Sequence, residues 1–268
     1  MSAVLDTTVA FALLALIFLP LERLHAAHRQ RVLRREWATD LLFFLGQHLL
    51  FTAPVVAVLV QVHRHSDALP LADLRAAVAG LPTWLQLLGV VLLSDLAIYW
   101  GHRLSHQVPL LWRFHRVHHT APRLDWLAAY REHPFDNLYT RLIENLPLIL
   151  LGVPLHLLAG FAMFRGLWAV FIHSNANLTP GPLRYLIGAP RLHHWHHDLK
   201  TGGRVNFANL SPLMDLAFGT YHDPGHFPER YGIDEDLDHA WWRQLVEPFV
   251  PGDRTEAAKT GAERGDLA

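Results

Sequence analysis

The chain has 268 residues, of which 51% are hydrophobic and 18% are charged, and its formal net charge at pH 7 is -1. This composition favours a membrane protein over a soluble enzyme, and the near-zero charge argues against nucleic-acid binding, which usually needs a basic surface. The absence of cysteine excludes disulfides, thiolate haem ligands, cysteine-ligated iron–sulfur clusters and cysteine zinc sites. Any metal must be held by nitrogen and oxygen ligands.

The N-terminal region, residues 1–84, is predicted to consist of membrane helices. Three apolar stretches, at 7–21, 41–62 and 76–94, each approach the roughly 20 residues that a membrane-crossing helix needs. The alternative is a set of buried helices in a large soluble protein, but three such stretches are rare in soluble chains. No Lys or Arg precedes the first stretch, so a secretory signal peptide is not expected.

A fourth apolar region, 146–172, is interrupted only by Arg165 and contains Gly152, Pro154 and Gly160. A single crossing here would place the histidines before and after it on opposite sides of the membrane. We therefore expect a re-entrant hairpin, or two short tilted helices, folded at 154–160.

The distribution of arginine predicts the orientation. Two connecting segments are rich in arginine: one follows the first span, and the other follows the third span. By the positive-inside rule both are cytoplasmic, and the N-terminus lies outside. This places the histidine clusters at the cytoplasmic face, in a bacterial inner membrane. The arginines are Arg23, Arg29, Arg31, Arg34 and Arg35 in the first segment, and Arg103, Arg113, Arg116, Arg123 and Arg131 in the second.

Three tight histidine clusters point to a metal centre, because neutral imidazole is a common ligand for iron and zinc. In the first cluster, Asp95, Tyr99, His102 and His106 share one helix face. His102 and His106 can ligate one metal, while Asp95 is expected to accept a hydrogen bond from a ligand imidazole, with Tyr99 also near the ligands. Taken alone, this pair is equally compatible with histidines at the headgroup level.

The second and third clusters share the pattern H-x-x-H-H. In a helix the first histidine faces the other two, while the adjacent pair diverges by about 100°. Each cluster can therefore serve two metals. The predicted ligands are His115, His118 and His119 in the second cluster, and His193, His196 and His197 in the third.

Four other side chains are candidates near the metals. His173 is a plausible ninth ligand, and Asn177, one turn on, contributes directly, through a water, or as a helix cap. His133 is expected behind the ligands, paired with Arg131 or Glu132. His194 is predicted either to support a ligand or to lie at the surface.

Eight or nine imidazoles exceed the need of one zinc and suit two metals with open positions, as O2-activating iron requires. The sequence thus predicts a two-iron centre that uses O2 to oxidise a lipid entering from the bilayer. A histidine-rich metal transporter or metal-storage protein is the alternative, although transporters place their ligands near the middle of the membrane.

These motifs resemble the fatty acid hydroxylase / sterol desaturase superfamily over about residues 85–221. The matching strings are YWGHRLSH ending at His106, WRFHRVHH ending at His119, REHP from Arg131, PRLHHWHH ending at His197, and LMDLAFGTY ending at Tyr221. The resemblance implies a membrane di-iron lipid oxygenase with ligands at the eight cluster histidines named above and at His173. Some relatives carry a histidine where this chain has Asn177.

The expected fold is an all-α integral membrane protein with about four membrane-embedded helical regions and a cytoplasmic helical cap carrying the histidine clusters. The expected parts are membrane helices at 1–84, a catalytic domain at 85–222 that includes the hairpin 146–172, and a C-terminal extension at 223–268 with a disordered tail from 252. No haem-binding domain or nucleotide-binding motif occurs in the sequence, so electrons are expected from a separate cytochrome b5-, ferredoxin- or reductase-type protein.

Overall fold

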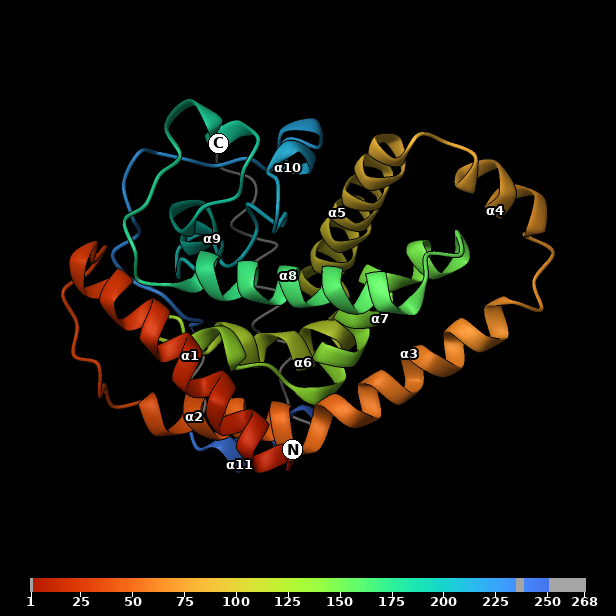
Figure 1. Cartoon of the computed structure of the whole chain (residues 1–268). Helices are drawn as coiled ribbons and strands as arrows, with labels where there is room; N and C mark the ends of the chain where they lie inside the picture. The colour runs from red at the N-terminus through yellow and green to blue at the C-terminus, as the bar shows by residue number, and fades with distance from the viewer. Residues whose placement is uncertain (1, 235–238, 251–268) are drawn as a thin grey trace.

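The computed structural model describes residues 2–234 and 239–250. Within these two ranges the chain forms eleven α-helices, a π-helical turn and short 3-10 turns, with no β-strand beyond two isolated bridges (Figure 1). The predicted all-α integral membrane fold is confirmed. The predicted disordered tail from residue 252 lies outside the described residues.

Four helical segments of the described chain are long and apolar enough to cross a bilayer. They are α1 (Ala3–Leu24), the continuous segment Trp37–Ser66, α5 (Thr83–Gln107) and α8 (Leu155–His173). Many of their apolar side chains are exposed on the outside of the protein, which would be unfavourable in water. On α1, Leu13, Leu16 and Ile17 are each more than half exposed. Lipid is the environment in which such a surface is stable.

The segment Trp37–Ser66 is a single helix with one widened turn. It consists of α2 (Trp37–Gly46), a π-helical turn (Gln47–Phe51) and α3 (Thr52–Ser66). Pro54 has no N–H to donate to the carbonyl of Leu50, so the regular helical bond fails at this point. The hydroxyl of Thr52 donates to the Gln47 carbonyl at 2.7 Å and helps to satisfy the widened turn.

The third membrane helix begins later than the sequence pattern predicted. The apolar stretch 76–94 is divided between α4 (Ala72–Ala79) and α5, with a break at Gly80–Pro82. Proline cannot continue an existing helix but suits the position before a new one. The spanning helix is therefore α5, and its last two turns carry His102 and His106.

The chain turns back on itself between α7 (Pro134–Leu150) and α8. Arg165 of α8 forms an ion pair with Glu144 of α7, and Leu158 packs against Leu148, as expected for antiparallel helices. The turn lies at 151–154, where Gly152 has φ +79°, and not at the predicted 154–160. Gly160 lies inside α8, because a single glycine weakens a helix without ending it.

Short helices and loops form a cap at the ends of α5 and α8 (Figure 1). Val108 is extended before Pro109, so α5 ends there and the chain changes direction at once. This places the second histidine cluster beside the first. The remaining helices of the cap are α6 (Pro109–His119), α9 (Pro190–His196), α10 (Leu213–Ala217) and α11 (Trp241–Val246).

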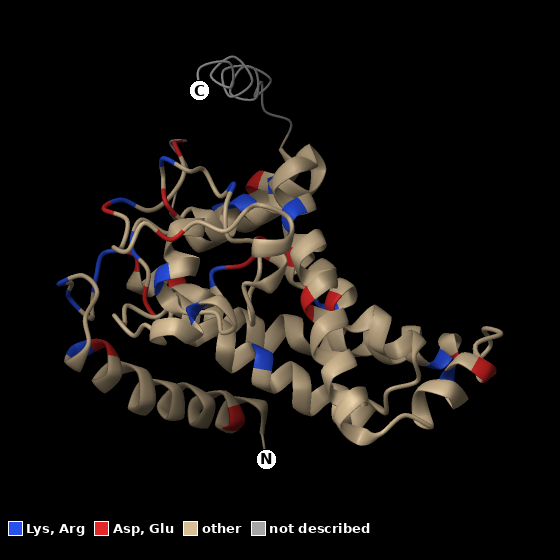
Figure 2. Cartoon of the chain, turned by 90° about the horizontal axis from the view of Figure 1, so that it is seen from above, with Lys and Arg blue, Asp and Glu red and all other residues tan. Residues whose placement is uncertain are grey.

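A buried apolar cluster joins the N-terminal helices to the rest of the molecule. Phe18 of α1, Phe44 of α2 and Val170 of α8 pack around Trp126 and Leu127, which lie in the loop after α6. The N-terminal helices therefore pack directly against the segments on either side of the histidines. Figure 2 shows that charged residues are sparse along the long helices and concentrate at their ends and in the cap.

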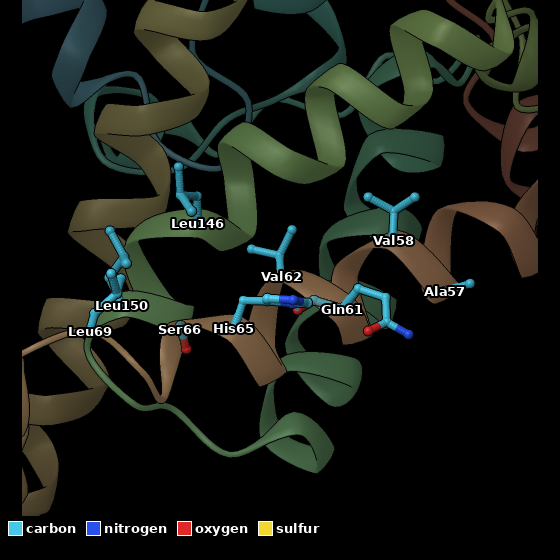
Figure 3. A pocket seen from close by; sticks show the side chains of 9 residues that line it. All are labelled: Ala57, Val58, Gln61, Val62, His65, Ser66, Leu69, Leu146 and Leu150. Carbon is cyan, nitrogen blue, oxygen red and sulfur yellow. Dashed lines mark hydrogen bonds between the residues drawn. The ribbon is translucent and has the colours of Figure 1, made fainter.

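A shallow groove of about 540 Å³ lies between α3 and the end of α7 (Figure 3). Its walls are mainly apolar, with Val58, Val62, Leu146 and Leu150 among the lining side chains. No lining residue belongs to a histidine cluster. The groove is thus separate from the candidate site.

Candidate metal centre

The structure brings all nine expected histidines together in two groups. In each group, one nitrogen atom from every member lies within 4.8 Å of the others. The five-histidine group consists of His102, His106, His115, His119 and His196, and the four-histidine group consists of His118, His173, His193 and His197. The groups adjoin, since the rings of His119 and His197 stack with centroids 4.4 Å apart.

Helix geometry explains how one cluster serves both groups. In α6, His115 and His119 are one turn apart and point to the five-histidine group. His118 is rotated by about 100° from His119 and points to the four-histidine group. The third cluster divides in the same way, with His196 in one group and His197 in the other.

Four of the imidazoles are oriented by backbone carbonyl oxygens, which accept a hydrogen bond from the ring nitrogen that faces away from the group. The Nδ1 atoms of His102, His118 and His173 donate to the carbonyl oxygens of Phe207, Arg131 and Ala169 at 2.7, 3.0 and 2.7 Å. His196 donates in the same way to Val205 at 2.8 Å. A carbonyl oxygen can only accept, so each of these Nδ1 atoms carries the hydrogen. In the neutral ring, Nε2 is then a bare lone pair aimed into the group.

The resulting arrangement fits a cation. The Nε2 atoms of His118 and His173 lie 2.9 Å apart, and His173 Nε2 lies 2.9 Å from His193 Nε2. Two lone pairs at this separation repel unless a positive ion attracts both. The buried Nε2 of His196 has no hydrogen-bond partner, which is equally costly unless a metal binds it.

Burial keeps the ring nitrogens free of extra protons. Desolvation, followed by repulsion from neighbouring imidazoles, lowers the pKa of five cap histidines well below the usual value; these are His118, His119, His193, His196 and His197. A metal ligand must be in this neutral form. The donor set is therefore ready for metal at neutral pH.

Asp136 is a functional residue that sequence reasoning missed. Its Oδ2 accepts a hydrogen bond from His115 Nδ1 at 2.9 Å, and both side chains are buried. A carboxylate behind a ligand imidazole fixes its tautomer and raises its basicity. Asp136 lies in the first turn of α7, and no spacing in the sequence links it to the second cluster.

Gly203 is the other such residue. Its φ is +71°, and a Cβ atom added to it would lie 2.3 Å from the His106 ring. Only glycine allows the backbone to approach this imidazole so closely. A Gly-Gly pair shortly after the third cluster was the available signal in the sequence.

Asp95 does not hold a ligand imidazole, contrary to expectation. Its Oδ1 accepts from Arg165 Nη1 at 2.7 Å, and Arg165 also pairs with Glu144 at 2.8 Å, forming a buried triad between α5, α7 and α8. Asp95 precedes His102 by two helical turns, about 10 Å along the axis, and so lies deeper in the membrane region. The buried guanidinium of Arg165 attracts the Asp95 carboxylate more strongly than a distant neutral imidazole does.

Tyr99 also lies away from the nitrogens and braces a loop. Its hydroxyl accepts from Arg103 Nη1 at 2.9 Å and lies 3.0 Å from Thr220 Oγ1. Asp215 accepts from Thr220 Oγ1 and from the backbone N–H of Phe207, whose carbonyl holds His102. Tyr99 therefore contacts the loop that orients a predicted ligand.

The predictions for His133 and Asn177 are wrong in detail. His133 accepts from the N–H of Phe135 at the start of α7 and bonds the Leu245 carbonyl at 3.1 Å, so it caps a helix and holds α11. Helix α8 ends at His173, so Asn177 is not on the same face one turn on. Asn177 is exposed, and its N–H donates to the His25 carbonyl.

His194 is fully buried behind His173. Its Nε2 lies 3.2 and 3.1 Å from the carbonyl oxygens of His173 and Ser174, and Tyr231 Oη lies 2.8 Å from its Nδ1. Burial lowers the pKa of His194 to about 3. As a neutral ring, His194 bonds the end of α8 to the C-terminal segment.

An apolar helical protein with two polyhistidine groups at the ends of its long helices belongs to the class of membrane metalloproteins. Comparison with known families shows which family of membrane metalloproteins the chain belongs to. A sequence model described as fatty acid hydroxylase matches residues 87–220, half of the chain, including every histidine of both groups. The chain belongs to the fatty acid hydroxylase family.

Similar proteins carry names of lipid-oxidising enzymes. Ornithine lipid hydroxylase OlsE of Rhizobium tropici is 32% identical over 171 residues, or 63% of this chain and 51% of the relative. Alkylglycerol monooxygenase of Homo sapiens is 31% identical over 133 residues, or 47% of this chain and 28% of the relative. A Delta(7)-sterol 5(6)-desaturase of Gibberella zeae is 28% identical over 162 residues, or 59% of this chain and 43% of the relative.

The chain thus spans about half the length of the first of these relatives and less of the other two. No solved structure matches the chain.

Proposed function

We propose that this chain is a membrane-bound, non-haem di-iron oxygenase that hydroxylates or desaturates a lipid, using O2 and electrons from a separate electron-transfer protein. The observation that carries the proposal is the convergence of nine imidazoles into two adjoining groups. Nitrogen donors suit iron, and the relatives are named as a lipid hydroxylase, a monooxygenase and a sterol desaturase.

In this proposal the five-histidine group holds one iron and the four-histidine group holds the other. The bound pair would supply the redox chemistry that reduces O2 and removes hydrogen from an unactivated C–H bond. The protein's part is to fix the imidazoles through Asp136 and the backbone carbonyls, and to exclude water by burying the site. Hydroxylation balances as one lipid, one O2, two electrons and two protons giving the alcohol and water, and desaturation gives an alkene and two waters.

A substrate that arrives from the bilayer fits the position of the site. His102 and His106 lie in the last turns of α5, and His173 is the last residue of α8. Both helices are apolar enough to span the membrane. A lipid chain that lies between them can reach the imidazole end without leaving an apolar environment. We assign the catalytic domain to residues 85–222 on this basis.

We place the protein in a bacterial inner membrane with the metal centre facing the cytoplasm. Exposed arginines at the end of α1 and in the following loop support this orientation through the positive-inside rule. That loop lies on the histidine side, because the N–H of Ala27 donates to the Asn175 carbonyl, two residues after His173. A separate cytochrome b5-, ferredoxin- or reductase-type donor would approach from the same side.

The comparisons do not favour a metal transporter or metal-storage protein, because each relative described above is named as a lipid-oxidising enzyme. The histidines also lie at helix ends and in the cap, whereas transporters bind their cargo near the middle of the membrane.

Lipid extracts test the proposal directly. Cells that express the chain should contain a lipid heavier by one oxygen atom, or lighter by two hydrogen atoms, than its counterpart in cells that express a His118→Ala/His196→Ala variant. Growth under isotopic oxygen should place the label in a hydroxylated product. Identical lipid profiles, with iron bound and a competent electron donor present, would count against the proposed activity.

A further inference from the structure

A second hollow, of about 340 Å³, lies where α1 ends and the chain turns towards α2. We call it the arginine pocket, because Arg23, Arg29 and Arg31 line it. It also touches Asp125, in the loop after α6, and Asn175, just after α8. The pocket therefore lies at the end of a membrane helix, on the same side of the membrane as the histidines.

The three arginines have no acidic partner among the described residues. Each is exposed, and none of their guanidinium groups forms a hydrogen bond or ion pair within residues 2–234 and 239–250. The loop 25–36 carries a fourth exposed arginine, Arg35, next to the pocket residues. In Figure 2 the blue ribbon segments, which mark Lys and Arg, recur at the end of α1 and along this loop. Such a surface attracts an anion.

The two carboxylates of the pocket are already engaged and do not neutralise the arginines. Glu22 accepts from the N–H groups of Trp126 and Asn175 at 2.7 and 3.0 Å. Asp125 accepts two bonds from the buried Arg34, at 2.7 and 2.8 Å. These bonds occupy the oxygens of both acids, and no ion pair joins either acid to Arg23, Arg29 or Arg31 among the described residues.

Large apolar side chains lie exposed beside the same arginines. Leu24 is 78% exposed and Leu33 is 71% exposed. Exposed leucine is costly in water but stable in the acyl region of a bilayer. Arginines between such leucines lie at the depth of the lipid phosphates, where a long side chain can extend to the headgroup.

We propose that the arginine pocket binds the phosphodiester headgroup of an anionic membrane phospholipid. Guanidinium matches phosphate geometry and donates two parallel hydrogen bonds, and the concave pocket offers room for one headgroup. The flanking leucines favour a lipid over a soluble protein partner. Two lining residues connect the pocket to the metal-site segments. Asn175 closely follows His173, and Asp125 pairs with Arg34, which shares Asp40 with Arg131.

Native mass spectrometry of the detergent-solubilised full chain provides the test, with phosphatidylglycerol titrated against phosphatidylcholine. The wild type should bind phosphatidylglycerol preferentially. A juxtamembrane arginine contributes about fivefold in affinity, so Arg23→Gln/Arg29→Gln/Arg31→Gln should lose about a hundredfold. The double variant Arg29→Gln/Arg31→Gln should lose about twenty-five-fold and serves if the triple variant is poorly produced.

The control variant Arg64→Gln/Arg204→Gln/Arg230→Gln removes three exposed arginines elsewhere and should bind phosphatidylglycerol as the wild type does. Equal binding by the pocket variants and the wild type would overturn the proposal. So would displacement of the lipid by inorganic phosphate at similar concentration, which would indicate a site for free anions. If the pocket variants bound phosphatidylglycerol as the wild type does, but an electron donor reduced their metal centre more slowly, the pocket would instead be a docking surface for a protein. The lipid-binding measurements do not depend on catalytic activity, so they test the pocket separately from the proposed function.

Discussion

The Nε2 atoms of His118 and His173 lie 2.9 Å apart, although the two residues are 55 positions apart in the sequence. Each ring donates its Nδ1 hydrogen to a backbone carbonyl, from Arg131 and Ala169. Both lone pairs therefore point at the same place. The structure fixes these rings in an arrangement that is stable around a cation and strained without one.

The division of the histidines predicts selective loss of metal. His118→Ala should deplete the four-histidine group, and His196→Ala should deplete the five-histidine group, because each removes a nitrogen from one group only. Each single variant should retain about one metal per chain, and the double variant close to none. Elemental analysis of purified protein measures this, with the exposed His65→Ala as the control. Identical metal content in all variants would exclude the two groups as the binding sites.

Asp136→Asn should weaken metal binding without abolishing it. The substitution keeps an oxygen near His115 Nδ1 but removes the charge that strengthens the bond. Loss of such a supporting group typically lowers metal affinity by about 10–100-fold. Competition with a chelator gives the affinity, and Asp67→Asn, at an exposed carboxylate, is the control. An unchanged affinity would show that His115 does not need its carboxylate.

Substitutions at two neighbouring glycines distinguish the cost of backbone strain from the cost of a clash with a ligand imidazole. Gly202 and Gly203 both have positive φ, at +58° and +71°, but only Gly203 faces a ring: a Cβ would lie 2.3 Å from His106. Gly202→Ala should cost about 1 kcal/mol of stability from the left-handed backbone alone. Gly203→Ala should cost about 1–3 kcal/mol more and also reduce metal content. Thermal unfolding in detergent and metal analysis distinguish the two, and equal effects would contradict the close approach.

The buried triad should be sensitive to removal of its only cation. Arg165→Met leaves Asp95 buried without a cation, while Glu144 keeps its ion pair with Arg141 at 2.8 Å. Breaking a buried pair in this way costs about 3–5 kcal/mol. Asp95→Asn leaves the Arg165–Glu144 pair in place and should cost less. Denaturation in mixed micelles ranks the two variants. Greater damage from Asp95→Asn would mean that Asp95 has a role beyond the triad.

The metal-free protein should become less stable as the pH falls. The pKa values of His118, His119, His193 and His197 lie well below the usual 6.5, because burial and neighbouring imidazoles disfavour the charged ring. Below about pH 6.5 the unfolded chain binds protons that the folded chain does not, so acid favours unfolding. Above this pH the buried neutral histidines do not weaken the fold. As the pH falls below it, the free energy of unfolding decreases progressively.

Unfolding temperatures of the metal-free protein between pH 8 and pH 5, within the range where unfolded histidine titrates, check this sign. Bound metal should protect the fold over the upper part of the range, since protons and metal compete for the same nitrogens. A metal-free protein that gains stability on acidification would show that the rings are not buried as neutral groups.

Residue spacing was sufficient to predict that the histidines serve two metals, because the adjacent histidines of H-x-x-H-H point in different directions from a helix. The all-α membrane fold also followed from the lengths of the apolar stretches. The helix ends were harder: Gly80–Pro82 interrupts a continuous apolar stretch, and Gly160, expected in a turn, lies inside α8. Hydrophobicity alone does not show where backbone hydrogen bonds end.

The partners of the ligands were beyond sequence reasoning, because they depend on tertiary contacts. Carbonyl oxygens of Phe207, Val205 and Arg131 hold three imidazoles, and every residue has such an oxygen. Asp95 shared a helix face with His102, yet Arg165, from α8, determines its partner. Spacing along one helix gives the direction of a side chain but not what a distant segment places opposite it.

The metal content of the purified full chain tests the central claim most directly. After expression with iron and mild detergent extraction, elemental analysis should give about two irons per chain, one for each histidine group. One metal per chain or less, after reconstitution with excess ferrous iron under exclusion of air, would contradict a paired centre.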